Sequence, residues 1–286
     1  MRATFILARM TFREALRRKI VLTALLLGIC FLVIYSIGVH MIIGNIHSLA
    51  QNNAGGNPQA TGIVSSEGVN FLTLAGLYAV AFLSIAMGAL LGADTMAGEI
   101  NSGTIQSIVT KPIHRRDVVL GKWLGFAVLL ALYSILMSGG TVVSMFTQSG
   151  VFPPHVILGI LLVYSESLLI MTVSLTCSSV FSALATGGIV FGLYGLAFIG
   201  GWVEQFGSLV QNQTAVDVGI VTSLIIPSEA LWRRAAYEMQ SPLSGILGIS
   251  PFGTISVPSP LMIAYAGVYL LGSLYLAVRL FEKRDL

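Results

Sequence analysis

Stretches of about twenty mostly apolar residues recur six times along this chain of 286 residues. A helix of about 20 residues is long enough to cross the hydrocarbon core of a bilayer. The six stretches cover residues 20–43, 71–93, 123–146, 156–177, 184–203 and 261–280. Only 9% of the residues are charged, against about 25% in a typical soluble domain, which is too few to cover a water-facing surface. The chain is therefore predicted to be an all-α integral membrane protein with six transmembrane helices.

The lysines and arginines predict the direction of these helices, because positive residues favour the cytoplasmic side of a membrane. Thirteen of them lie before the first stretch, between the second and third, or around the end of the sixth: Arg2, Arg9, Arg13, Arg17, Arg18, Lys19, Lys111, Arg115, Arg116, Lys122, Arg279, Lys283 and Arg284. Arg233 and Arg234 are the two exceptions. Both termini and residues 94–122 are therefore expected in the cytoplasm, and residues 44–70 and 204–260 are expected as external loops.

The second external loop, residues 204–260, contains an apolar stretch that is too short to span and that ends at Pro227. A seventh crossing here would place the basic C-terminal residues outside, against the charge pattern. We expect a helix at the membrane surface that continues after Pro227, with Trp232 and Tyr237 at the membrane–water boundary. An external loop that merely packs on the spans is the alternative.

The N-terminal residues 1–19 are predicted to form a helix that lies on the membrane surface. Apolar and basic side chains recur there at helical spacing: Phe5, Phe12 and Leu16 share one face, and Arg9, Arg13 and Arg17 follow beside it. An apolar strip flanked by cations is typical of helices that lie on anionic lipid. A plain basic anchor before the first span is the alternative.

Two pairs of glycines within the apolar stretches have the spacing that lets helices approach closely. Gly88 and Gly92 form one pair, and Gly188 and Gly192 form the other. Small residues at i and i+4 remove side-chain bulk from one face of a membrane helix. The sequence does not say which neighbouring helix either pair meets.

The cytoplasmic segment 94–122 is a compact charged region in a chain that has few charges. Its first half has residues on one helical face, namely Ile100, Thr104, Ile108 and Lys111. Pro112 would end that helix, and a second helix would begin near Asp117, whose charge suits a helix N-terminus. We interpret the segment as a short helix–turn–helix that docks on another protein. An ordinary charged loop is the alternative.

The order of residues in this segment resembles the cytoplasmic signature of ABC-2 type transporter permeases. That signature reads roughly E-x-x-x-G-T, an apolar stretch, P-x-x-R and G-K, and it lies between the second and third of six spans. The matching residues here are Glu99, Gly103, Thr104, Pro112, Arg115 or Arg116, Gly121 and Lys122. The resemblance covers nearly the whole chain, as a single transmembrane domain over residues 1–286. The long 204–260 loop departs from the shortest members of the family.

The resemblance implies that the chain is the transmembrane permease subunit of an ABC exporter in a bacterial cytoplasmic membrane. Because the chain has no G-x-x-x-x-G-K-[ST] phosphate loop, ATP and Mg²⁺ are expected on a separate ATPase subunit. Two ATPase copies imply two permease halves, expected as a homodimer, although a related second permease can replace one copy. The chain is expected to have no enzymatic activity, cofactor or nucleic-acid partner of its own, and to contact membrane lipid.

The resemblance also implies roles for particular residues. The coupling segment would contact the ATPase through Glu99, Gly103, Thr104, Ile108, Pro112, Arg115 and Arg116. Within this set, Glu99 would pair with a cation and Pro112 would set the bend. Four basic residues are expected at the membrane surface: Arg9, Arg13, Arg17 and Lys122.

Glu166 lies near the middle of the fourth apolar stretch, where a charged group is costly and therefore faces an interior or a cavity. It is a candidate for a substrate contact or for a polar latch that shifts when the transporter opens. The alternative is a protonated glutamate that is hydrogen-bonded between helices to Ser165, Ser167 or a backbone carbonyl.

Three other classes of function are alternatives to an ABC exporter subunit. A transporter driven by an ion gradient would use Glu166 for protons, and a membrane anchor for a mechanically acting ABC ATPase would share every feature above. A membrane enzyme would need a nucleophile, a base or metal ligands near one leaflet, and the sequence has no such set. His40 and His47 are interpreted as ordinary histidines and no metal site is predicted. The sequence does not identify the transported substrate.

Overall fold

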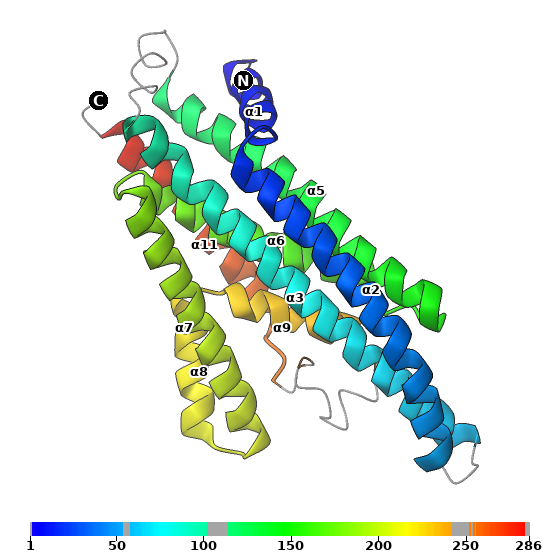
Figure 1. The fold of residues 1–286 in the computed structure, drawn as a ribbon. Helices are drawn as coiled ribbons and strands as arrows, with labels where there is room; N and C mark the ends of the chain where they lie inside the picture. Colours follow the sequence, from blue (N-terminus) through cyan, green and yellow to red (C-terminus); the bar gives the residue numbers. More distant parts are fainter. Residues whose placement is uncertain are drawn as a thin grey trace.

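The computed structural model describes residues 2–53, 58–101, 114–241, 252, 254 and 256–283. Every regular element within these residues is a helix (Figure 1). The six expected spans are all present as long helices: α2 (Lys19–Asn53), α3 (Pro58–Asn101), α5 (Arg115–Ser149), α6 (Val156–Ser178), α7 (Ala183–Leu209) and α11 (Pro260–Glu282). Each is long and apolar enough to cross a membrane. The predicted class, a helical membrane protein with six spans, is confirmed.

The external loop predicted over residues 44–70 is too long, because most of these residues are helical. Helix α2 continues to Asn53, and helix α3 already begins at Pro58. With 35 residues, α2 is about 52 Å long, whereas the hydrocarbon core is about 30 Å thick. No proline interrupts residues 19–53, so the helix continues into polar sequence.

Helices α3, α5 and α6 form the centre of the bundle. In their most apolar windows 61%, 56% and 61% of the residues are buried, compared with 11% in α2 and in α11. Small residues bring α3 and α6 together, because a Cβ on Gly88 would lie 2.8 Å from the Ser167 carbonyl oxygen. The Ser174 hydroxyl donates to the Ala89 carbonyl at 2.6 Å. Gly188 and Gly192 of α7, in contrast, meet no described atom of this chain within 4 Å.

Helix α1 (Arg2–Ala15) is a separate element that packs across the first turns of α5. It ends before the turn at residues 16–18, and α2 follows in a different direction (Figure 1). Phe5 is 75% exposed, whereas Phe12 is partly buried against a hydrophobic cluster of the bundle, so the three expected apolar residues do not all face one way. The predicted N-terminal helix exists, and its position on the membrane remains a prediction.

The segment before α11 contains two helices that turn back into the bundle. Helix α8 (Gln213–Ile225) runs beside α7, and α9 (Ser228–Met239) is bent from it by 110°. Near one end of α9, Glu238 lies 3.1 Å from His155, which precedes α6. Near the other end, Glu229 lies within electrostatic range of Glu166, about 16 Å further along α6. Helix α9 therefore runs alongside the first half of α6.

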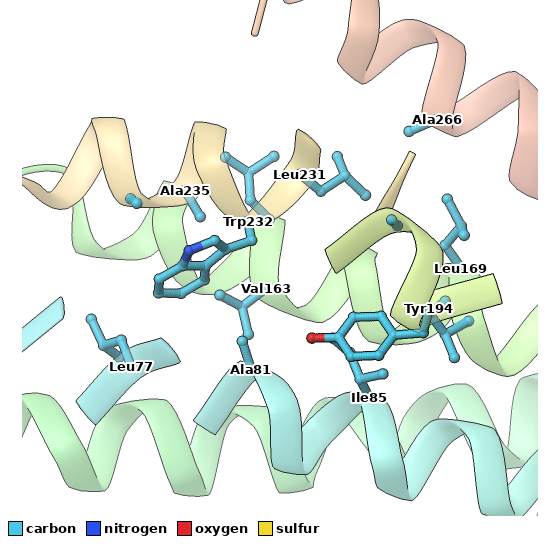
Figure 2. Close-up of a cluster of buried hydrophobic side chains, with 14 of the residues drawn as sticks. Leu77, Ala81, Ile85, Val163, Leu169, Tyr194, Leu231, Trp232, Ala235 and Ala266 are labelled. Atoms are coloured by element: carbon cyan, nitrogen blue, oxygen red, sulfur yellow. The ribbon is translucent and has the colours of Figure 1, made fainter. Parts of the chain in front are cut away.

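The expected position of Trp232 at the membrane–water boundary is wrong. Its side chain is 2% exposed and lies among Leu77, Ala81 and Val163 in the largest hydrophobic cluster (Figure 2). The prediction failed because the amphipathic pattern of α9 suggests one face in contact with lipid or water, whereas nine of its twelve residues are buried by other helices. Tyr237, by contrast, is 43% exposed and stacks beneath the Arg234 guanidinium.

Candidate functional sites at the bundle end and in the membrane interior

One end of the bundle gathers α1, the last turn of α3, the first turn of α5 and the last turn of α11 (Figure 1). Glu99 lies in the last turn of α3, which ends at Asn101. The structure describes the chain again from His114 onward, and α5 begins at Arg115. Four residues of the expected coupling set lie outside the described residues: Gly103, Thr104, Ile108 and Pro112. The helix expected to restart near Asp117 is observed as the start of α5.

The α3 side of this segment is tied to the N-terminal helices by Arg18. The Arg18 guanidinium lies 3.1 Å from Asp94 and 2.7 Å from Glu14. Asp94 is on α3, about one turn before Glu99, and Glu14 is in the last turn of α1. Displacement of the end of α3 would therefore be transmitted to the junction of α1 and α2.

The α5 side is held by a close helix contact with α1. A Cβ on Gly121 would lie 2.6 Å from the Leu7 Cβ, and one on Gly125 would lie 2.7 Å from the Ala8 carbonyl oxygen. The Thr4 hydroxyl donates to Asp117 at 3.1 Å. This contact was not predicted, although Gly121 and Gly125 have the same i, i+4 spacing as the two glycine pairs named above.

The basic residues at this end occupy different environments. Arg115 donates to the Glu282 carbonyl at 3.3 Å and so joins α5 to the end of α11. Arg115 and Arg116 line a depression of about 380 Å³ together with His114 and Glu282. Lys122 is buried, with 6% of its surface exposed. The three arginines expected at the membrane surface are exposed: Arg9, Arg13 and Arg17.

Glu166 is buried inside the bundle, as expected for an intramembrane carboxyl group. Its side chain is 1% exposed, and its Oε2 has no hydrogen-bond partner among the described residues. The serines considered as partners donate elsewhere, Ser165 to the Leu161 carbonyl and Ser167 to the Tyr164 carbonyl. Its electrostatic neighbour is Glu229 of α9, which is 3% exposed. A second buried carboxyl group from α9 was not predicted from the sequence.

A buried ion pair fixes α8 and α9 beside these carboxyl groups. Arg233 of α9 lies 2.5 Å from Glu204 of α7, and their side chains are 2% and 6% exposed. Arg233 also donates to Ser223 of α8 at 3.4 Å, and Ser256 donates to Glu204 at 2.7 Å. One arginine thus joins α7, α8 and α9. In the sequence, Arg233 stood out because it lies outside the groups of basic residues expected in the cytoplasm.

The comparison with protein families bears on both regions. The model of the ABC-2 family transporter proteins matches residues 5–286.

The chain belongs to the ABC-2 family.

Membership explains the six apolar helices, since proteins of this family are the membrane subunits of transporters and are not themselves catalytic. The family in general works with an ABC ATPase. No curated protein matches the chain. Within the described part of the ABC-2 subunit, no three His, Cys, Asp or Glu side chains are grouped as metal ligands would be.

Proposed function

We propose that this ABC-2 subunit is one permease half of an ABC exporter and that the segment 94–122 couples it to ATP hydrolysis by a partner subunit. The observation that carries this proposal is the anchoring of both flanks of the segment. On the α3 side, Asp94 pairs with Arg18. On the α5 side, Asp117 and Gly121 both contact α1. A rigid-body movement of the ATPase against this segment would thus act on α1, α3 and α5 together.

The complete transporter contains two copies of this chain and two ATPase subunits, which bind ATP and Mg²⁺. Family membership supports the ATPase partner, and the exposed apolar faces of α2, α7 and α11 leave room for a second permease copy and for lipid. Both termini lie in the cytoplasm of a bacterium, and the α8–α9 pair enters the membrane from the external side. This orientation agrees with the positive-inside pattern, because the basic residues of α1 lie at the same end of the bundle as Arg115 and Lys283.

Glu166 and Glu229 serve as two buried polar groups between α6 and the re-entrant helix α9, and their surroundings change when the transporter opens. Their position in the interior supports this role, because both side chains are at most 3% exposed. Movement of α9 relative to α6 would change the environment of two carboxyl groups at once. A direct contact with substrate is the second role that the same position allows.

The test co-expresses the tagged chain with each candidate ABC ATPase, purifies the complex in mild detergent, and measures subunit ratio and ATP hydrolysis. We expect a complex of two permease and two ATPase chains. Glu99→Lys should keep membrane insertion and strongly reduce ATP hydrolysis by the complex. The control Asp217→Lys makes the same change of sign on exposed α8, at the other end of the molecule. Normal hydrolysis by Glu99→Lys, or equal loss in both variants, would refute the coupling role.

A further inference from the structure

Three buried acidic side chains surround one buried basic side chain where α6, α7 and α9 pack together. The acids are Glu166, Glu204 and Glu229, which are 1%, 4% and 3% exposed, and the base is Arg233, which is 2% exposed. Arg233 lies within electrostatic range of Glu229, which in turn lies within range of Glu166. With all three carboxyl groups ionised, this interior would hold more negative than positive charge, which is very costly away from water.

The partners of the three acids show which of them carries the negative charge. Glu204 has a counter-charge, because Arg233 forms its ion pair with it, and it also accepts a hydrogen bond from Ser256. Glu166 and Glu229 have no ion pair in the described part of the chain, and the Oε2 atom of each has no hydrogen-bond partner there. The Ser228 hydroxyl, next to Glu229, is likewise buried without a partner. Arg233 therefore neutralises Glu204, and the other two carboxyl groups need another source of positive charge.

The helices around Glu166 and Glu229 supply no further cation. Tyr78 of α3 and Tyr194 of α7 lie within electrostatic range of both carboxyl groups, and Gly201 of α7 leaves the space that the Glu229 side chain fills. The charged residues of α5 and α11 lie at the end of the bundle that holds α1, and α8 has only the exposed Asp217. Within the described residues, a proton on each carboxyl group is the simplest way to make this interior neutral.

We propose that Glu166 and Glu229 form a proton-binding site in the interior of the bundle, with one proton on each carboxyl group while α9 packs against α6. Movement of α9 that brings water to Glu229 would release its proton, because an exposed glutamate is ionised near neutral pH. Opening of the transporter would therefore be favoured as the pH rises. This proposal rests on the role proposed above for the two carboxyl groups. Its test measures bound protons in the chain alone, so its failure is distinct from a failure of the coupling to an ATPase.

Infrared spectroscopy of the purified full chain detects these protons, because the C=O stretching band of a protonated carboxyl group is separate from the bands of a carboxylate. At about pH 7, where exposed carboxyl groups are ionised, we expect this band in the wild-type chain. Glu166→Gln and Glu229→Gln should each remove part of the band, and the double variant should remove all of it. Glu204→Gln is the matched control and should leave the band unchanged, because this buried carboxyl group is paired with Arg233. A wild-type chain without the band would overturn the proposal.

The dependence of stability on pH counts the same protons. The folded chain keeps them, whereas the unfolded chain releases them above about pH 5, so stability should fall as the pH rises from there. The equilibrium constant for unfolding should increase about tenfold per pH unit for each retained proton. The double variant Glu166→Gln with Glu229→Gln should lose this dependence and keep the wild-type Tm at about pH 5, because glutamine resembles a neutral carboxyl group in shape.

Two results of the stability measurement would contradict the proposal. The first is a pH dependence that the double variant shares with the wild-type chain. The second is a Tm that rises with Na⁺ concentration in the wild-type chain and not in the double variant, which would show a bound metal cation in place of the protons.

Discussion

Arg233 and Glu204 form an ion pair at a place where neither side chain reaches water. Removing two charges from water is costly, and such a pair is tolerated because its members neutralise each other and are further hydrogen-bonded. Here Ser223 and Ser256 supply those hydrogen bonds. The pair therefore does less to add stability than to select one position of α9 relative to α7.

Breaking this pair from one side should be strongly destabilising. We expect Arg233→Met to lower the free energy of unfolding by about 3–5 kcal/mol, because it leaves Glu204 buried without a counter-charge. The double variant Arg233→Met with Glu204→Leu should recover most of this loss. Thermal unfolding of the detergent-purified chain measures both effects. Arg234→Met, at a neighbouring arginine that is 21% exposed, is the control and should have a smaller effect.

At the scale of elements, glycine decides how α1 meets α5. Gly121 and Gly125 lie one turn apart and face Leu7 and Ala8, so the two backbones touch where α5 begins. This contact stands next to the proposed coupling segment. Helix α1 is thereby part of the structure through which the segment acts on the spans.

Adding a single methyl group should test this packing. A Cβ on Gly121 would lie 2.6 Å from the Leu7 Cβ and 3.0 Å from the Thr4 carbonyl oxygen. Gly121→Ala should therefore cost about 1–3 kcal/mol and lower the Tm of the purified chain, as overpacking usually does. Gly188→Ala is the matched control, since a Cβ there meets no described atom of the chain within 4 Å. Equal Tm values for the two variants would show that α1 yields without cost.

At the scale of the whole molecule, six spans would leave both ends of the chain on one side of the membrane, and we expect that α8 with α9 does not add a crossing. Met239 of α9 packs against Gly159, near the start of α6, so the pair returns to the side from which it entered. A crossing would instead leave α11 and the basic C-terminal residues in the reverse orientation. The charge pattern and the fold agree on this point.

Labelling of single cysteines should confirm this topology. In a chain with Cys30 and Cys177 replaced by alanine, a membrane-impermeant maleimide should label Gln211→Cys and Tyr237→Cys in intact cells. Lys283→Cys should react only after the cells are made permeable. Ala235→Cys, at a residue that is 0% exposed, is the control for burial and should stay unlabelled. Labelling of Lys283→Cys in intact cells would contradict a cytoplasmic C-terminus.

The sequence by itself determined the class of the protein, the number of spans and the resemblance to ABC-2 permeases. These properties depend on segment length and composition, because a bilayer rewards any sufficiently long apolar helix in the same way. The charge pattern added a direction for the helices. The position of Glu166 within an apolar stretch also predicted that it is buried, since a carboxyl group there has to lie inside a membrane bundle.

Only the tertiary structure decided what meets Glu166 and where α9 lies. Pro227 and the short apolar stretch before it are compatible with a surface helix, and Trp232 is equally suited to a core or to a membrane surface. Whether α9 lies at the membrane surface or inside the bundle depends on its contacts with α6 and α7. The contacts on α7 include Glu204, Gly201 and Ala197. Such contacts join residues that are distant in sequence, so no local pattern contains them.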